Sequence, residues 1–260
     1  VWTLGLLAVI ALGVGCGGGP GEEPAAGDAA EAGMGERPLV KTTCYPMDWL
    51  VRQLAGKRVE RELIIPPGKD PVHWQPEPET IAHLADADLV IANGAGYEKW
   101  MQTATLPPDG VVYTAEGLDL IEREGVTHSH GMGGEHSHAG TDPHTWSDPD
   151  LFIEQAERVA EELVRIDPEH SEVYNTALAQ LTATLEELNG AYEELFGAMA
   201  DDVALAANHP AYGYLARHYG FAIVSFALDP SEVGSDEAIH GVEEWTAEVS
   251  RQVMFWEESP

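Results

Sequence analysis

The sequence predicts an α/β protein made of two Rossmann-like lobes, each with a parallel sheet, joined by one long rigid helix. Short apolar, β-branched runs alternate with helical patterns in both halves of the chain, as βαβ units require. Apolar residues also recur every three or four positions from Tyr174 to Leu195, which is the period of an amphipathic helix. A third feature, a tract rich in Gly and His over residues 127–149, follows the first set of strands and helices.

Length and charge limit the classes of function. The chain has 260 residues, enough for one large domain or two small lobes. Its net charge of −32 argues against nucleic acid as a partner and favours cations. Solubility, or adaptation to a salty medium, accounts for this charge equally well.

The first residues are typical of an export signal. An apolar run of small residues ends at Cys16. It is short for a membrane span, which needs about 20 residues, but it suits the core of a signal peptide. Residues 12–16 resemble a bacterial lipobox, so we expect a signal peptide over residues 1–16 and a lipid on Cys16. A plain secretion signal and a membrane anchor are the alternatives. Residues 17–38 are expected to form a flexible tether.

The first half of the folded part alternates between strand and helix patterns. We expect an N-terminal lobe over residues 39–149 that includes a His-rich loop at residues 127–140. Cys44 lies in an apolar run and is expected to be a buried thiol without a disulfide. The expected strands are residues 39–45, 59–65, 88–93 and 111–113. The expected helices are residues 46–55, closed by Gly56, then 77–87, and one that starts over 97–101.

A helical connector over residues 150–199 is expected to follow the loop. Asp148 or Ser147 caps its first helix, which Pro149 opens and Asp167-Pro168 ends. The second helix has roughly 30 residues and a length of about 45 Å at 1.5 Å per residue. We interpret it as a spine along the side of two lobes, and the alternative is a coiled-coil dimer helix.

The α/β pattern then returns in a C-terminal lobe over residues 200–260, which we expect to be incomplete. The expected strands are residues 203–207, 222–226 and 253–256, and the expected helices are residues 210–219 and 236–252.

The His-rich tract is the first candidate for metal chemistry. It holds five of the eleven histidines, and two His-Ser-His pairs flank its glycines. Such a tract cannot pack a core, so we interpret it as a mobile metal-binding loop, with a solvated polar loop as the alternative. The fifth residue, His144, lies between two prolines at a helix entrance, where the stiff backbone suits a fixed site. The accessory ligands of the loop are His128, His130, His136 and His138.

Three further candidates follow predicted strands. His73 comes after the strand 59–65, His209 after the strand 203–207, and Glu257, with Glu258 as its alternative, after the strand 253–256. In open parallel sheets, ligands bind beyond the carboxyl ends of the strands. We therefore expect these residues and His144 to meet in a cleft between the lobes, where three imidazoles and a carboxylate or water suit tetrahedral zinc.

Several motifs resemble one family, the zinc/manganese ABC-transporter substrate-binding lipoproteins, also described as cluster A-I metal-binding proteins. The most specific is Asp142-Pro143-His144-Thr145-Trp146-Ser147-Asp148-Pro149, and the similarity covers residues 39–260 in the family's order. The other similar segments are Thr42-Thr43-Cys44-Tyr45-Pro46, the Pro-Pro-Gly-x-Asp-Pro loop that starts at Pro66, Leu89 to Glu98, and Asn208 to Gly220.

This resemblance implies two lobes joined by a rigid helix, one metal in the cleft and delivery of that metal to an ABC permease and its ATPase. By motif, it implies that His144 and His209 are ligands. A His at the third position, His209, resembles the zinc members and favours Zn²⁺ over Mn²⁺. The spacing departs from the family's at the first ligand, because Val72 follows Asp-Pro directly and His73 comes one residue later. Glu257 matches a family Glu by position, but not the usual acidic ligand.

We therefore expect a monomeric receptor, held by its lipid on the periplasmic or extracellular face of the cell envelope, that captures Zn²⁺ for import. It catalyses no reaction. A zinc hydrolase with an open three-His site is one alternative, and it requires a general base beside the metal. A metal buffer or adhesin that works without a permease is the other alternative.

Overall fold

The computed structural model describes residues 37–69, 71–106, 110–123, 127–129, 135–137, 140–200, 202–226, 236–248 and 251–256. Residues 37–260 form one compact unit. Residues 1–36, which hold the expected signal peptide and Cys16, lie outside the described residues. Of the helices that are described, none combines the length and the apolar character needed to cross a bilayer.

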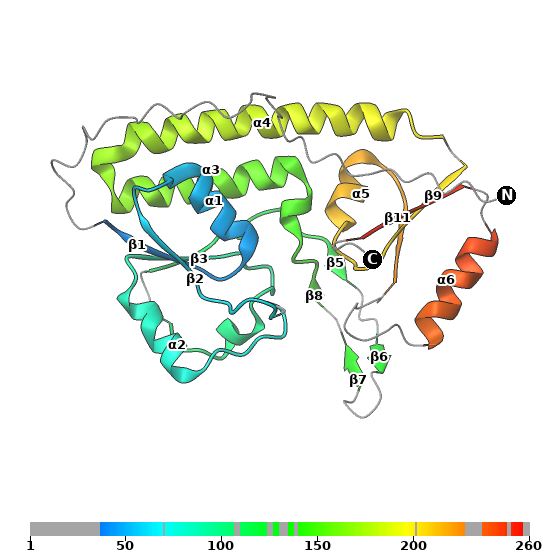
Figure 1. Cartoon of the computed structure of the whole chain (residues 1–260), viewed down its shortest axis with the longest axis horizontal. Coiled ribbons are helices and arrows are strands. Elements are labelled where there is room, and N and C mark those ends of the chain that lie inside the picture. Colours follow the sequence, from blue (N-terminus) through cyan, green and yellow to red (C-terminus); the bar gives the residue numbers. More distant parts are fainter. Residues whose placement is uncertain are drawn as a thin grey trace, which may run out of the picture. The chain divides into compact units, whose positions relative to one another are not determined.

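The N-terminal sheet has four strands in the order β2-β1-β3-β4, and every neighbouring pair is parallel (Figure 1). Within the sheet, Val40 of β1 lies beside Arg61 of β2 on one side and Leu89 of β3 on the other. The strands are β1 (Leu39–Thr42), β2 (Glu60–Leu63), β3 (Leu89–Ala92) and β4 (Val111–Tyr113). All four strands expected in this half are confirmed, at or inside their predicted ranges.

Each helix of this half has a proline in its first turn, and a glycine ends the first of them. Helix α1 (Tyr45–Ala55) has Pro46 in its first turn, where the missing N–H costs no hydrogen bond, and Gly56 ends it with a φ of 55°. Helix α2 (Pro78–His83) is shorter than expected and continues as a 3-10 turn, Leu84–Asp86.

The helix expected to start over residues 97–101 is wrong. The structure has only a 3-10 turn there, Lys99–Gln102. Two prolines follow at positions 107 and 108. A proline disfavours the α conformation in the residue before it, which limits how far a helix could extend from residue 97.

The long helix of the connector is confirmed. Helix α3 (Pro149–Ile166) begins at the N-cap Asp148, whose side chain accepts a hydrogen bond from the backbone N–H of Asp150. A 3-10 turn, Pro168–His170, leads into α4 (Ser171–Gly197), which has 27 residues. Helix α4 packs along α3 and α1 and also contacts α5 (Figure 1). It therefore supports elements from both halves of the same chain.

The C-terminal sheet has three parallel strands in the order β10-β9-β11. These strands are β9 (Val203–Ala207), β10 (Ile223–Ser225) and β11 (Arg251–Phe255). Helix α5 (Gly213–Tyr219) starts later than expected and ends at Gly220, which takes the left-handed conformation with a φ of 71°. Helix α6 spans Asp236–Glu248. The strands and helices predicted for this half are confirmed in order, but the last helix was predicted to reach Gln252, and Arg251 and Gln252 belong to strand β11 instead.

The His-rich tract contains strands that were not predicted. Strand β6 (Thr127–Ser129) pairs antiparallel with β7 (Glu135–Ser137), and β5 (Glu122–Arg123) pairs with β8 (Gly140–Thr141). The expectation of a loop throughout is therefore corrected. The residue types alternate in each His-Ser-His run with the period of a strand, and glycines between two such runs favour a hairpin.

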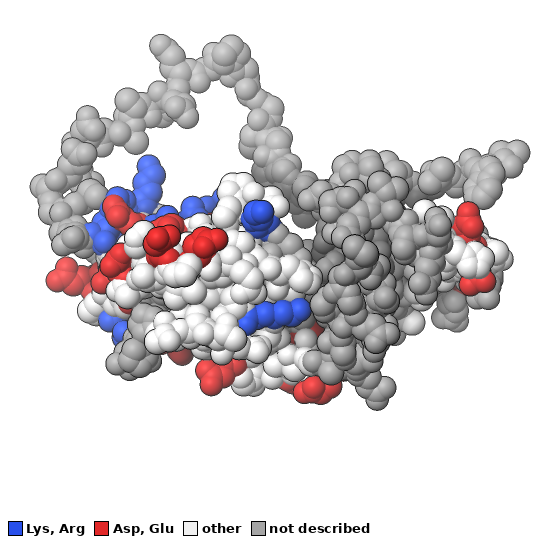
Figure 2. Space-filling model, turned by 90° about the horizontal axis from the view of Figure 1, so that it is seen from below, with Lys and Arg blue, Asp and Glu red and all other residues white. Residues whose placement is uncertain are grey.

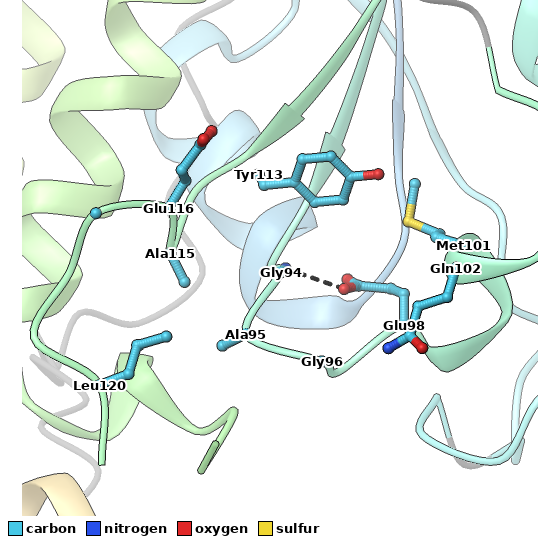
Figure 3. Close-up of a pocket in the computed structure, with 11 residues that line it drawn as sticks. Gly94, Ala95, Gly96, Glu98, Met101, Gln102, Tyr113, Ala115, Glu116 and Leu120 are labelled. Atoms are coloured by element: carbon cyan, nitrogen blue, oxygen red, sulfur yellow. Dashed lines mark hydrogen bonds between the residues drawn. The ribbon is translucent and has the colours of Figure 1, made fainter. Parts of the chain in front are cut away.

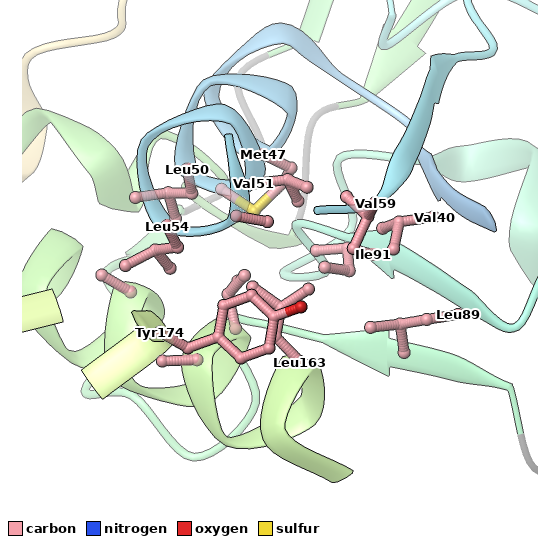
Figure 4. Packing of buried hydrophobic residues seen from close by; sticks show 14 of the residues in the cluster. Val40, Met47, Leu50, Val51, Leu54, Val59, Leu89, Ile91, Leu163 and Tyr174 are labelled. Carbon is pink, nitrogen blue, oxygen red and sulfur yellow. The ribbon is translucent and has the colours of Figure 1, made fainter. Parts of the chain in front are cut away.

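Helices cover both faces of the N-terminal sheet, and the alternation along β3 shows how. Leu89 and Ile91 belong to the main apolar cluster with α1, α3 and α4. Val90 and Ala92 belong to a second cluster that contains Leu84, next to α2. Figure 4 shows part of the main cluster, where residues of α1 meet the strands and two residues of the connector, Leu163 and Tyr174.

Charge is not of one sign over the described surface. The chain has 45 Asp and Glu against 13 Lys and Arg. Even so, Figure 2 shows both basic and acidic side chains on the described part of one face. This mixed surface fits the solubility interpretation of the net charge at least as well as a field that attracts cations.

Candidate metal site

His144 is held in a fixed orientation by a neighbouring carboxylate. Its side chain is buried, and it lies between β8 and the 3-10 turn Thr145–Ser147. One oxygen of Asp142, Oδ1, accepts from the backbone N–H of His144 at 3.0 Å and lies 2.7 Å from its ring nitrogen Nδ1. A carboxylate on Nδ1 favours the tautomer that leaves the lone pair on Nε2, which is how proteins orient a metal-binding histidine.

His209 reaches His144 from the C-terminal sheet. It follows β9 after one residue, Asn208, whose backbone N–H donates to the carbonyl of Phe255 at 3.0 Å. The two Nε2 atoms of His144 and His209 lie 3.3 Å apart, and the ring planes are at 84°. Two Zn–N bonds of about 2.0–2.1 Å at a tetrahedral angle place their nitrogens about 3.3–3.4 Å apart. The pair therefore has the spacing of two ligands on one tetrahedral ion.

Aromatic rings line His144. The ring centroid of Trp146 lies 5.3 Å from that of His144, and the centroid of Tyr97 lies 6.2 Å from it. The rings of Tyr97 and Trp146 also contact each other, with their centroids 5.1 Å apart. These rings restrict the rotation of the imidazole and limit the water around it.

A buried polar hub, which sequence reasoning missed, supports the segment that carries His144. The side-chain amide of Asn93 donates to the carbonyl of Pro143 at 2.9 Å. Its oxygen accepts from Gln155 at 3.0 Å and from Thr145 at 3.3 Å. Gln155 also donates to Thr114 at 2.7 Å. The detectable signals were a polar residue at the end of β3 and a Gln on the apolar face of α3.

A cavity of about 390 Å³ lies beside the turn Gly94–Gly96, with Glu98 in its wall (Figure 3). The Glu98 carboxylate accepts from the backbone N–H groups of Asn93 at 2.8 Å and Gly94 at 3.0 Å, and from Thr43 at 2.6 Å. Burial raises the pKa of Glu98 above its usual value, and these hydrogen bonds oppose that rise. Glu98 therefore holds the turn that starts at Asn93.

Of the other predicted ligands, the structure describes His73 in full and only the backbone of His128 and His136. His73 is exposed and lies in the turn over residues 71–73. In the described part of the chain, one group of three or more His, Cys, Asp or Glu side chains has ligand atoms within 4.8 Å of one another, and His73 is not in it. Glu257, His130 and His138 lie outside the described residues. For His128 and His136, the structure describes only the backbone, which pairs the two residues across β6 and β7.

The group of His and Asp side chains found close together in the described residues consists of Asp148, Asp150 and His218. His218 Nδ1 lies 2.8 Å from Asp148 Oδ1, and its Nε2 lies 3.8 Å from Asp150 Oδ2. Asp148 also caps α3, and Asp150 accepts from Asn189 of α4 at 2.8 Å. The positive end of a helix dipole disfavours a cation, so this cluster is best explained as a structural link among α3, α4 and α5.

The buried thiol predicted at Cys44 is confirmed. Its side chain is fully buried at the start of α1, and burial is the main cause that raises the pKa of the thiol. A thiol in such surroundings stays protonated and unreactive.

Comparison with known proteins agrees with the motifs. The family described as "Zinc-uptake complex component A periplasmic" matches residues 40–260. The High-affinity zinc uptake system protein ZnuA of Bacillus subtilis is 29% identical over 231 residues, which are 86% of this chain and 72% of that protein. The Zinc-binding lipoprotein AdcA of Streptococcus pneumoniae is 27% identical over 228 residues, and the chain spans only 45% of its length. The Manganese-binding lipoprotein MntA of Halalkalibacterium halodurans is 24% identical over 259 residues, which cover 97% of this chain and 79% of MntA.

Solved structures have the same fold. The metal-dependent lipoprotein YcdH from Bacillus subtilis superposes with a TM-score of 0.71 at 26% identity, over 85% of this chain and 80% of that one. The laminin binding protein Lmb of Streptococcus agalactiae has a TM-score of 0.65 at 22% identity, over 84% and 79% of the two chains, and it shows the fold alone. The two-lobed α/β fold is therefore confirmed, and the chain belongs to the zinc-uptake component A family of metal ABC-transporter substrate-binding proteins, which are receptors and not enzymes.

Proposed function

We propose that this protein is the zinc receptor of an uptake system, which captures Zn²⁺ outside the cytoplasm and delivers it to an ABC permease and its ATPase. The observation that carries the proposal is the 3.3 Å between the Nε2 atoms of His144 and His209, which suits two ligands of one tetrahedral ion. Imidazole nitrogen suits zinc, whereas manganese prefers oxygen ligands.

The relatives also support the choice of zinc over manganese. The zinc relatives named above are 29% and 27% identical to this chain, against 24% for the manganese relative. Manganese is the second candidate, because MntA aligns with 97% of the chain. Affinities for Zn²⁺ and Mn²⁺ measured side by side distinguish the two. A chain that prefers Mn²⁺ at equal concentration contradicts the choice of zinc.

The proposal includes a complete set of ligands. His73 and Glu257 are the proposed third and fourth ligands, and a water takes the place of either one that does not bind. His128, His130, His136 and His138 are proposed to recruit zinc before it reaches the fixed site. We further propose lobes at residues 39–149 and 200–260 joined by the connector 150–199, a monomeric chain, and a lipid on Cys16 that tethers it to the membrane.

The central test is zinc affinity of the soluble part, residues 37–260, by competition with a chromophoric chelator at neutral pH. His144→Ala and His209→Ala are each expected to weaken binding far more than deletion of residues 127–138. The matched control is His83→Ala, because His83 is exposed on α2. Wild-type protein that binds no zinc, or a His144→Ala variant that binds as tightly as wild type, contradicts the proposal. Equal losses from the loop deletion and from His144→Ala contradict separate roles for loop and site.

A further inference from the structure

We propose that Gly213, the first residue of α5, is a positioning residue for the metal site. It allows α5 to lie against the carboxylate of Asp142, which in turn orients His144. The inference rests on the proposed function, because it concerns the same pair of histidines. It adds a residue outside the expected ligand set and assigns it a steric role.

The space beside Gly213 is too small for a side chain. A Cβ added at this position would lie 2.8 Å from Oδ2 of Asp142 and 3.8 Å from its Cγ. Atoms this close repel, so a substitution must move either the carboxylate or the helix. The backbone of Gly213 is helical and not left-handed, so its conformation does not require glycine. The lack of space beside Asp142 is therefore the physical reason for glycine here.

The carboxylate of Asp142 is not free to move away. Asp142 is only 2% exposed, and its other oxygen, Oδ1, is hydrogen-bonded to the backbone and ring of His144. The backbone of Asp142 and that of Ile121 are also held by α5: the hydroxyl of Tyr214 donates to the carbonyl of Asp142 at 2.7 Å and accepts from the N–H of Ile121 at 3.1 Å. Turning the carboxylate therefore breaks the contact that orients the His144 ring.

Moving the helix instead affects the other histidine. His209 lies four residues before Gly213, on the segment that joins β9 to α5. If α5 shifts away from Asp142, this segment shifts with it, and the 3.3 Å between the two Nε2 atoms changes. Either response disturbs the same ion, so Gly213 couples the position of α5 to the geometry of both ligands.

A double-mutant cycle tests this coupling. The variants are Gly213→Ala, Asp142→Ala and the two combined, with Gly190→Ala as the control, because a Cβ at helical Gly190 meets no atom within 4 Å. Zn²⁺ affinity is measured by chelator competition, and the visible spectrum of bound Co²⁺ reports the ligand geometry. Loss of a group that orients a ligand typically weakens metal binding about 10–100-fold. We expect a loss of at least about tenfold for Gly213→Ala with an altered Co²⁺ spectrum, and no change for the control.

The combined variant gives the decisive comparison. Once the carboxylate is gone, a methyl group at position 213 has room, so adding Gly213→Ala to Asp142→Ala is expected to cause no further loss of affinity. Full additivity of the two losses overturns the inference, as does a Gly213→Ala variant with wild-type affinity. Wild-type protein that binds no zinc refutes the proposed function itself, which is a different result.

Folding is checked in the same set of variants. If Gly213→Ala alone does not fold, the cycle is read from thermal unfolding. The inference then requires that Asp142→Ala restore a cooperative transition to the Gly213→Ala chain. A combined variant that stays unfolded while Asp142→Ala alone folds overturns it.

Discussion

The hydroxyl of Tyr214 lies 2.7 Å from the carbonyl oxygen of Asp142 and donates a hydrogen bond to it inside the protein. This contact joins α5 of the C-terminal part to the segment that ends in His144, across 72 positions of the chain. The two candidate ligands therefore share a support, since His209 leads into the same helix.

Removing this hydroxyl tests the support. Tyr214→Phe leaves the carbonyl of Asp142 and the N–H of Ile121 without their shared partner, and an unsatisfied buried polar group costs about 1–3 kcal/mol. We expect a loss of this size in the free energy of unfolding, measured by urea denaturation, together with weaker zinc binding. Tyr45→Phe is the control, because Tyr45 is 60% exposed. Equal stability of the two variants would show that the hydroxyl contributes nothing.

The polar hub behind the site is the second target. Gln155 is fully buried and donates to both Asn93 and Thr114. Gln155→Leu keeps a similar volume but removes the buried hydrogen bonds to Asn93 and Thr114, so we expect a loss of about 2 kcal/mol in the free energy of unfolding. Gln180→Leu on the exposed side of α4 provides the matched change. A Gln155→Leu variant as stable as that control would rule out a structural role for the hub.

The junction between α3 and α4 predicts a dependence of stability on pH. Burial alone raises the pKa of Asp167, but hydrogen bonds from Tyr174 and His170, with the charge of Arg58, outweigh burial and hold it below its usual value. A carboxyl with a lowered pKa in the folded state contributes stability above its unfolded pKa, about 3.9, and loses it as the pH falls through the folded pKa. Asp167→Asn should therefore lower the melting temperature at pH 6 more than at pH 3.

The matching change for this test is Asp86→Asn, because Asp86 is exposed in the 3-10 turn after α2. Melting temperatures of both variants and of the wild type are compared between pH 3 and pH 6. If the effect of Asp167→Asn is the same at both ends of this range, the carboxyl does not have a lowered pKa in the folded protein.

Zinc itself should stabilise the fold. A ligand that binds only the folded state adds about 2.7 kcal/mol to the free energy of unfolding at 100 times its dissociation constant. We expect zinc to raise the melting temperature of the wild type, and a chelator to reverse the rise. The shift should disappear in His144→Ala and persist in His83→Ala. A shift of wild-type size in His144→Ala would place the stabilising ion elsewhere.

The affinity for zinc should also fall at acidic pH, because imidazoles must be neutral to bind metal.

The order and type of most elements could be predicted from the sequence, because their signals are local. Pro46 and Gly56 mark the two ends of α1, Asp148 caps α3, and short apolar runs mark most of the parallel strands. Local signals failed where a short pattern had two outcomes: the 3-10 turn at Lys99–Gln102 was expected to be helical, and β6 and β7 were expected to be loop. The motif around His144 was also evident from the sequence, because Pro143, Asp148 and Pro149 lie within a few positions of it.

Contacts between residues distant in the sequence could not be predicted in this way. The spacing of His144 and His209, the hub of Asn93 and Gln155, and the contact of Gly213 with Asp142 all join positions that are tens of residues apart. Such contacts depend on how α3, α4 and α5 pack and on the register of both sheets, and no local pattern specifies these. A glycine in a helix looks like a weak position in the sequence, and its reason becomes visible only when the neighbouring carboxylate is in place.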